Sequence, residues 1–174
     1  MALSTTLIIG VAGLAVVATA AYLLPASKRV ERTAKIKAAP ADIYRLIVSN
    51  KGFQTFNPYK DTDPKLQITL SGPEQGIGSA FAFAGKDGKG TQTITDVEEN
   101  RSVTMLIDLG PMGKPQQTFE LRPVEDGTAV TWGVNAGFGM NPIGRVFGLF
   151  MEKMQGPIIE RGLKNLSTSV EQAA

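Results

Sequence analysis

Residues 30–50 read VERTAKIKAAPADIYRLIVSN, and the spacing of the apolar residues changes halfway through this stretch. In residues 30–38 one side of the chain carries mainly Val, Ala and Ile and the other Glu, Thr and Lys, the two-residue period of a half-buried strand. After Pro40, which suits the first turn of a helix, apolar residues recur at helical spacing as far as Val48. The stretch therefore predicts a strand followed directly by a helix.

The chain beyond this helix carries further strand signals. Residues 49–64 are rich in Gly, Asn, Asp and Pro and predict an irregular connection. Short runs rich in β-branched or aromatic residues then follow at residues 66–72, 78–85, 90–99, 102–109, 116–124 and 127–135. The turns between these runs are too brief for crossover helices, so with the opening strand they predict a seven-stranded antiparallel sheet.

The last part of the chain predicts a long amphipathic helix. From Pro142 to about Val170, apolar residues recur at spacings of three, four or five. Gly156 and Pro157 fall inside this pattern, and we expect a kink or a brief break there. One face of several strands is strongly apolar, and the long helix is the element expected to cover it.

An uncharged apolar run lies near the start of the chain. Residues 7–24 contain no charged side chain, and at about 1.5 Å per residue the run would extend roughly 27 Å, close to the thickness of a bilayer core. A membrane anchor, a cleaved signal peptide and a buried core helix all remain open. The anchor is favoured because the run lacks a polar face and no Lys or Arg precedes it.

Basic residues follow this run directly. Lys28, Arg29 and Arg32 lie just after it, and by the positive-inside rule they place the rest of the chain on the cytoplasmic face of a single-pass membrane protein. The predicted organisation is an anchor or signal peptide at residues 1–27 and one domain at residues 28–174.

The composition excludes several kinds of chemistry. The chain has neither Cys nor His, which rules out disulfides, thiolate nucleophiles, imidazole acid–base catalysis and the usual zinc ligands. We therefore expect no metal and assign no cofactor. Its 18 basic and 16 acidic residues give a net charge of +2 and form no basic stripe, so nucleic acid is not an expected partner.

Five segments resemble one known family. They are VERTAKIKAAPADIYRLIVS at 30–49, FQTFNPYKDTDP at 53–64, SGPEQGIGSAFAF at 71–83, DGTAVTWGV at 126–134 and GPIIERGLKNL at 156–166. The chain is identified as a member of the SRPBCC superfamily, the START-like ligand binders, in the polyketide cyclase/dehydratase-type branch. In this sequence Phe53, Phe56 and Tyr59 stand where members usually carry tryptophans.

The resemblance implies an α+β helix-grip fold, in which a curved seven-stranded antiparallel sheet wraps around a long C-terminal helix. Here one transmembrane helix would precede that domain. The resemblance also implies a ligand cavity between sheet and helix, because a curved sheet leaves space that one helix does not fill. The candidate cavity-lining residues are aromatic, Met or Ile side chains: Phe53, Phe56, Tyr59, Phe81, Phe83, Met105, Ile107, Phe119, Trp132, Met140, Phe147, Phe150, Met151 and Met154.

Three functions fit these observations. The first is a membrane-tethered domain that binds a hydrophobic small molecule, either a lipid or a polycyclic, polyketide-like compound. The second is a cyclase/dehydratase-type enzyme, for which the charged candidates are Asp61, Asp63, Asp108, Arg145 and Glu152. Charged side chains of this kind are mostly solvated surface residues, so no catalytic residue is assigned. The third is a protein-docking adaptor related to chaperone-ATPase activators, which would expose an apolar patch.

Overall fold

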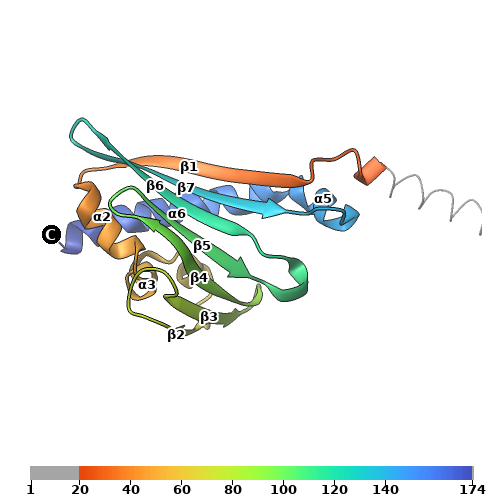
Figure 1. The fold of residues 1–174 in the computed structure, drawn as a ribbon, viewed down its shortest axis with the longest axis horizontal. Coiled ribbons are helices and arrows are strands. Elements are labelled where there is room, and N and C mark those ends of the chain that lie inside the picture. Colours follow the sequence, from red (N-terminus) through yellow and green to blue (C-terminus); the bar gives the residue numbers. More distant parts are fainter. Residues whose placement is uncertain (1–19, 174) are drawn as a thin grey trace, which may run out of the picture.

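One antiparallel sheet organises the protein. The computed structural model describes residues 20–173, and its seven strands lie in the order β1-β7-β6-β5-β4-β3-β2 (Figure 1). The strands are β1 Ser27–Ile36, β2 Gln67–Ser71, β3 Ala80–Gly85, β4 Gly88–Glu98, β5 Ser102–Asp108, β6 Gln116–Val124 and β7 Gly127–Gly137. The predicted seven-stranded sheet is therefore confirmed, and β1 and β2 form its two edges.

Helices cover one face of this sheet. They are α2 Pro40–Ile47, α3 Asn50–Phe56, α4 Tyr59–Thr62, the 3₁₀ turn η1 Gly110–Met112, α5 Pro142–Gly148 and α6 Met151–Ala173. The long helix α6 runs behind β1 and β7, and α2 and α3 lie beside its C-terminal half (Figure 1). A curved antiparallel sheet around a long terminal helix is the helix-grip arrangement expected from the sequence.

The change of period in residues 30–50 has the predicted structural result. In β1, Val30 and Ile36 are buried on the side that faces α6, and Glu31 points to the opposite side. The helix α2 begins at Pro40 and buries Ile43 and Ile47 against the sheet. Proline has no backbone N–H, and the first turn of a helix does not need one, so the helix can begin at Pro40, with three residues between it and the end of the strand.

The prediction of an irregular connection at residues 49–64 is wrong. The segment contains α3 and α4, and the Ser49 side chain caps α3 by accepting a hydrogen bond of 3.3 Å from the Gly52 backbone N–H. Phe53 and Phe56, three residues apart, lie on the buried side of α3. Burial of these two rings outweighs the low helix propensity of the surrounding Gly and Asn.

Of the kink or brief break predicted at Gly156 and Pro157, the break is wrong, and the kink stays a prediction. The helical segment is interrupted instead at residues 149–150, between α5 and α6. Helix α6 continues through Gly156 and Pro157. The Arg32 guanidinium of β1 donates to Glu152 at 2.6 Å and to Glu160 at 2.7 Å. These two carboxylates lie on either side of Pro157, so the bridge holds the helix together where proline removes a backbone hydrogen bond.

An aromatic cluster forms the centre of the core. Phe119 and Trp132 are cross-strand neighbours on β6 and β7, with ring centroids 4.6 Å apart. Phe53 and Phe56 of α3 pack edge-on against each other at 4.9 Å and both contact the Trp132 ring at about 6 Å. These four side chains are almost completely buried, and they join the sheet to α3.

The apolar run at residues 7–24 is described only from Ala20 onward, so most of the proposed anchor lies outside the described residues. Between residues 20 and 173, the protein has no helix with both the length and the apolar character needed to cross a bilayer. The division into residues 1–27 and 28–174 stays a prediction.

Candidate functional site

The structure separates the fourteen candidate residues into groups. The buried ones are Phe53, Phe56, Phe81, Met105, Phe119, Trp132 and Met151. Tyr59, Phe83 and Ile107 are half-buried. The remaining four, Met140, Phe147, Phe150 and Met154, are exposed around α5 and the beginning of α6. Contact of any of them with a ligand stays a prediction.

The inner face of β3, β4 and β5 is only partly covered. Helix α6 lies against β1 and β7. It leaves half-exposed three inward side chains of β3, of β5 and of the residue after β5: Phe83, Ile107 and Leu109. At Gly90 of β4 the ring of Phe83 packs directly on the backbone, because a β-carbon there would lie 2.8 Å from Cζ of Phe83. The apolar wall of the candidate site is therefore next to the aromatic core, toward the β5 end.

A buried polar group lies within this apolar wall. Gln92 of β4, Met105 of β5 and Gln117 of β6 all point inward, and each is at most 3% exposed. The Nε2 atoms of Gln92 and Gln117 donate to the sulfur of Met105 at 3.0 and 3.4 Å. We call Gln92 and Gln117 the glutamine pair. Thioether sulfur is a weak acceptor, so the pair retains capacity to bind a polar group of a ligand.

The polar row continues from the sheet to α3. Nε2 of Gln92 lies 3.5 Å from Oδ1 of Asn50, and Nδ2 of Asn50 donates to Oγ of Ser79 at 3.3 Å. Asn50 and Ser79 are also almost fully buried. Buried polar side chains are normally well satisfied. These long contacts therefore mark an interior where a further hydrogen-bonding group would be favourable.

Two buried donors have no partner among the described residues. They are the indole Nε1 of Trp132 and the amide Nε2 of Gln54. An unpaired buried N–H costs about 1–3 kcal/mol, and a buried tryptophan usually finds an acceptor. Trp132 therefore keeps an unpaired donor inside the closely packed aromatic core.

Tyr59 supplies a hydroxyl near the start of α6. Its Oη donates to Oε1 of Gln155 at 3.3 Å. Burial raises the pKa of Tyr59 above its ordinary value of 10.0, and the hydrogen bond to Gln155 opposes this shift. The phenol is therefore neutral at physiological pH and remains a hydrogen-bond donor.

The charged candidates for catalysis are engaged in other contacts. Asp61 accepts from Asn165 at 2.8 Å, Asp63 accepts from the backbone N–H of Lys86 at 2.7 Å, and Glu152 holds Arg32. Lys114 and the Gly110 N–H contact Asp108 and lower its pKa. Arg145 binds backbone carbonyls, as described below. The described part of the chain also has no group of three or more acidic residues placed to hold a metal ion.

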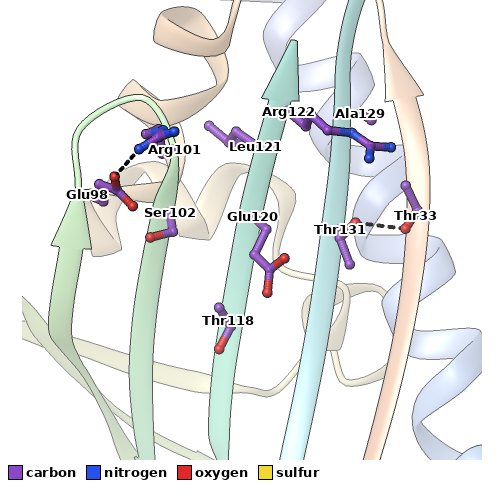
Figure 2. A pocket seen from close by; sticks show the side chains of 10 residues that line it. All are labelled: Thr33, Glu98, Arg101, Ser102, Thr118, Glu120, Leu121, Arg122, Ala129 and Thr131. Carbon is purple, nitrogen blue, oxygen red and sulfur yellow. Dashed lines mark hydrogen bonds and ion pairs between the residues drawn. The ribbon is translucent and has the colours of Figure 1, made fainter. Parts of the chain in front are cut away.

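A polar groove lies on the opposite face of the sheet. It has a volume of about 490 Å³, and Figure 2 shows it lined by short hydroxyl side chains and by charged ones on β1, β4, β5, β6 and β7. Thr33 and Thr131 share a hydrogen bond of 2.8 Å there, and Arg101 pairs with Glu98 at 2.5 Å. These groups are solvated or paired with one another. The groove therefore suits an apolar ligand less well than the inner face does.

Sequence reasoning missed the glutamine pair, although the pattern contains a signal for it. Gln92 is two residues from Ile94 and Gln117 is two residues from Phe119, so each shares the inward side of its strand with a buried apolar residue. A polar residue at an inward position is the informative exception to the apolar pattern.

The fold and the inner face together define a helix-grip domain with an apolar, partly polar interior. Residues 27–171 match the family model described as "Polyketide cyclase / dehydrase and lipid transport". The match covers most of the chain, which therefore belongs to this family. No curated protein matches the sequence.

Solved structures share the fold at low sequence identity. Norcoclaurine synthase from Thalictrum flavum, in complex with dopamine and hydroxybenzaldehyde, is 13% identical with a TM-score of 0.64, over 85% of this chain and 88% of that one. The di-domain ARO/CYC StfQ from the steffimycin biosynthetic pathway is 10% identical with a TM-score of 0.62, over 84% and 51%. Protein MLL2253 from Mesorhizobium loti is 17% identical with a TM-score of 0.58, over 84% and 99%.

Proposed function

We propose that this protein is a membrane-tethered domain that binds a hydrophobic small molecule carrying at least one carbonyl or hydroxyl group. The ligand lies against the inner face of β3, β4 and β5, beside the packed aromatic core. A lipid or a polycyclic, polyketide-like compound has this combination of an apolar body and a few oxygens.

The glutamine pair is the observation that carries the proposal. Two amides buried in an apolar wall donate to the same thioether sulfur, a weak acceptor, and the one further contact of Gln92 is the long one of 3.5 Å to Asn50. A ligand oxygen at the same position would replace a weak acceptor with a strong one. The half-exposed side chains Phe83 and Ile107 would contact the apolar body of that ligand.

Two comparisons support this assignment. The description of the family includes lipid transport as well as cyclase chemistry, and a norcoclaurine synthase of the same fold holds two small aromatic molecules. A cyclase-type reaction is the second candidate. The glutamine pair and the neutral Tyr59 phenol could orient and polarise substrate carbonyls without an ionised catalytic group.

Native mass spectrometry of the full chain in detergent, purified from its own host, tests the binding proposal. We expect a retained adduct of defined small-molecule mass in the wild-type protein. Gln117→Leu should lower its occupancy about tenfold, the effect of losing one buried hydrogen bond.

Adjacent Gln116 provides the matched control because it points to the outer face of the same strand. Gln116→Leu should leave occupancy unchanged, and the emission of Trp132, the one tryptophan of the chain, should report an intact core in both variants. A wild-type protein without any adduct, or equal occupancy in the two leucine variants, would contradict the proposal.

The membrane tether is a separate part of the proposal, supported by the apolar run at residues 7–24 and the basic residues that follow it. In this arrangement the ligand-binding domain lies on the cytoplasmic face. Alkaline extraction of a membrane fraction should leave the full-length chain in the pellet. Recovery of a shortened chain beginning near Ala21 in the supernatant would instead identify a cleaved signal peptide.

A further inference from the structure

A cluster of large apolar side chains is exposed around α5. We call it the α5 apolar face; its members are Met140, Ile143, Val146, Phe147, Phe150 and Met154. Ile143 is 79% exposed, and the rings of Phe147 and Phe150 are about half exposed. Single exposed apolar residues are normal on a protein surface, but such a concentration on one helix and its continuation indicates a contact surface.

The packing of α5 fixes the direction of this face. Gly144 and Gly148 lie one turn apart and rest on the ring of Phe138, where added β-carbons would come within 3.1 and 2.6 Å of ring atoms. Ile143 and Phe147 are also one turn apart, on a different side of the helix. Because the glycine side is packed against Phe138, just after the end of β7, rotation of α5 cannot bury the apolar face.

Arg145 ties α5 to the chain that enters the domain. Its guanidinium donates to the backbone carbonyls of Tyr22 at 2.6 Å and of Leu24 at 3.0 Å, and also to that of Gly139 at 2.7 Å. Figure 1 shows α5 at the end of the molecule where the first described residues approach β1. Leu23, between the two bound carbonyls, is 87% exposed.

The charge pattern around α5 identifies the surface that it would contact. Residues 139–151 contain Arg145 but no acidic residue; Glu152, the next residue, is paired with Arg32, and Lys153 follows it. The chain leading to Tyr22 is the uncharged run that begins at Leu7. An apolar helix face with basic residues beside it, next to a membrane-compatible segment, matches the interface of a bilayer that contains anionic lipids.

We propose that the α5 apolar face lies in the interfacial layer of the membrane that holds residues 7–24. This contact rests on the tether proposed above. It sets the orientation of the whole domain, because α5 is packed on Phe138 and bonded to Tyr22.

Quenching by brominated lipid tests this contact in the full chain. The chain is reconstituted into phosphatidylcholine and phosphatidylglycerol vesicles whose acyl chains carry bromine, and a tryptophan is introduced by Phe147→Trp. The matched control is Ile77→Trp, at another exposed apolar position, in the loop before β3. The emission of Trp132 in the wild-type chain is subtracted from both.

We expect the tryptophan at position 147 to lose about half or more of its emission, as for a ring roughly 5–10 Å inside the interface. The tryptophan at position 77 should keep its emission. Equal quenching at both positions, or none at position 147 in a vesicle-bound chain, overturns the contact while leaving the tether. A chain absent from the vesicle fraction overturns both.

A second copy of the chain could cover the α5 apolar face in place of the membrane, and a further experiment distinguishes the two. The protein has no natural cysteine, so Ile143→Cys introduces a single thiol on the α5 apolar face. We expect this variant to remain monomeric under mild oxidation in vesicles. A disulfide-linked dimer obtained at high yield and at low protein density would assign the face to self-association and overturn the proposal.

Discussion

Gly162 of α6 lies directly against the indole ring of Trp132, with no room between them for a β-carbon. This contact sets the distance between the long helix and β7 at the centre of the core. The indole is 1% exposed and is held by Phe53, Phe56 and Phe119, so it cannot move aside without disturbing three other rings.

We predict that Gly162→Ala destabilises the protein. Alanine would gain about 1 kcal/mol in helix propensity, but overpacking of a rigid core costs about 1–3 kcal/mol and the indole has no free space. The net loss in free energy of unfolding should therefore approach about 2 kcal/mol, the upper end of this balance, because the β-carbon would lie well inside the contact distance of an indole carbon; urea unfolding followed by Trp132 emission measures it.

Gly137→Ala is the control for this substitution. Gly137 ends β7, and a β-carbon there meets no atom within 4 Å. Its effect should stay within about 0.5 kcal/mol. An alanine at position 162 that stabilises the protein would show that the helix and sheet can separate more easily than this packing indicates.

A second prediction concerns the sulfur between the two amides. Met105→Leu conserves volume but removes the acceptor of the glutamine pair, and it should cost about 1 kcal/mol. Adding Gln117→Leu removes one unsatisfied amide, so the double variant should be more stable than the sum of the single effects predicts. A double-mutant cycle measures this coupling, expected at about 0.5–1 kcal/mol. Strict additivity would mean that the amides do not depend on the sulfur.

A third prediction follows from the turn after β5. Lys114 donates to the Asp108 carboxylate at 2.8 Å, and with the Gly110 backbone N–H it lowers the pKa of Asp108 below its ordinary value of 3.8. A lowered pKa in the folded state means that the contribution to stability is present above pH 3.8 and is lost as the pH falls through the folded pKa.

Lys114→Gln should raise the pKa of Asp108 toward 3.8 without reaching it, because the Gly110 N–H remains. The chemical shift of the carboxyl carbon during an NMR pH titration measures this change. Lys164→Gln on α6 serves as the control, for which an unchanged Asp108 titration is expected. A titration of Asp108 that is unaffected by loss of Lys114 would exclude the pairing in solution.

The strands of this fold could be predicted because their alternation is local. The inward side of a strand is indicated by apolar residues two positions apart, such as Val103 and Met105 in β5 or Phe119 and Leu121 in β6. The helix α3 could not be predicted in the same way. Its rings are buried by contacts with Trp132 and Phe81, which are distant in sequence, and its own composition favours a loop.

The site was less predictable than the fold. Exposed side chains on α5 and buried ones on α3 had the same apolar character in the sequence, and only the tertiary packing separates Phe147 from Phe53. The break at residues 149–150 was hidden for a related reason. Arg32, more than a hundred residues away, bonds to α6 on both sides of Pro157, and no local sequence pattern indicates this contact.

The charged side chains of β1 have a second effect, because this strand lies at the edge of the sheet. β1 has ten residues and lies at an open edge of the sheet, where its unpaired backbone groups are free to join a strand from another molecule. Lys28, Arg29, Glu31, Arg32 and Lys35 lie along it. Pairing of two such edges would crowd and desolvate these ions, so these residues, among them the Arg32 that bonds to α6, discourage fibre-like stacking of the protein.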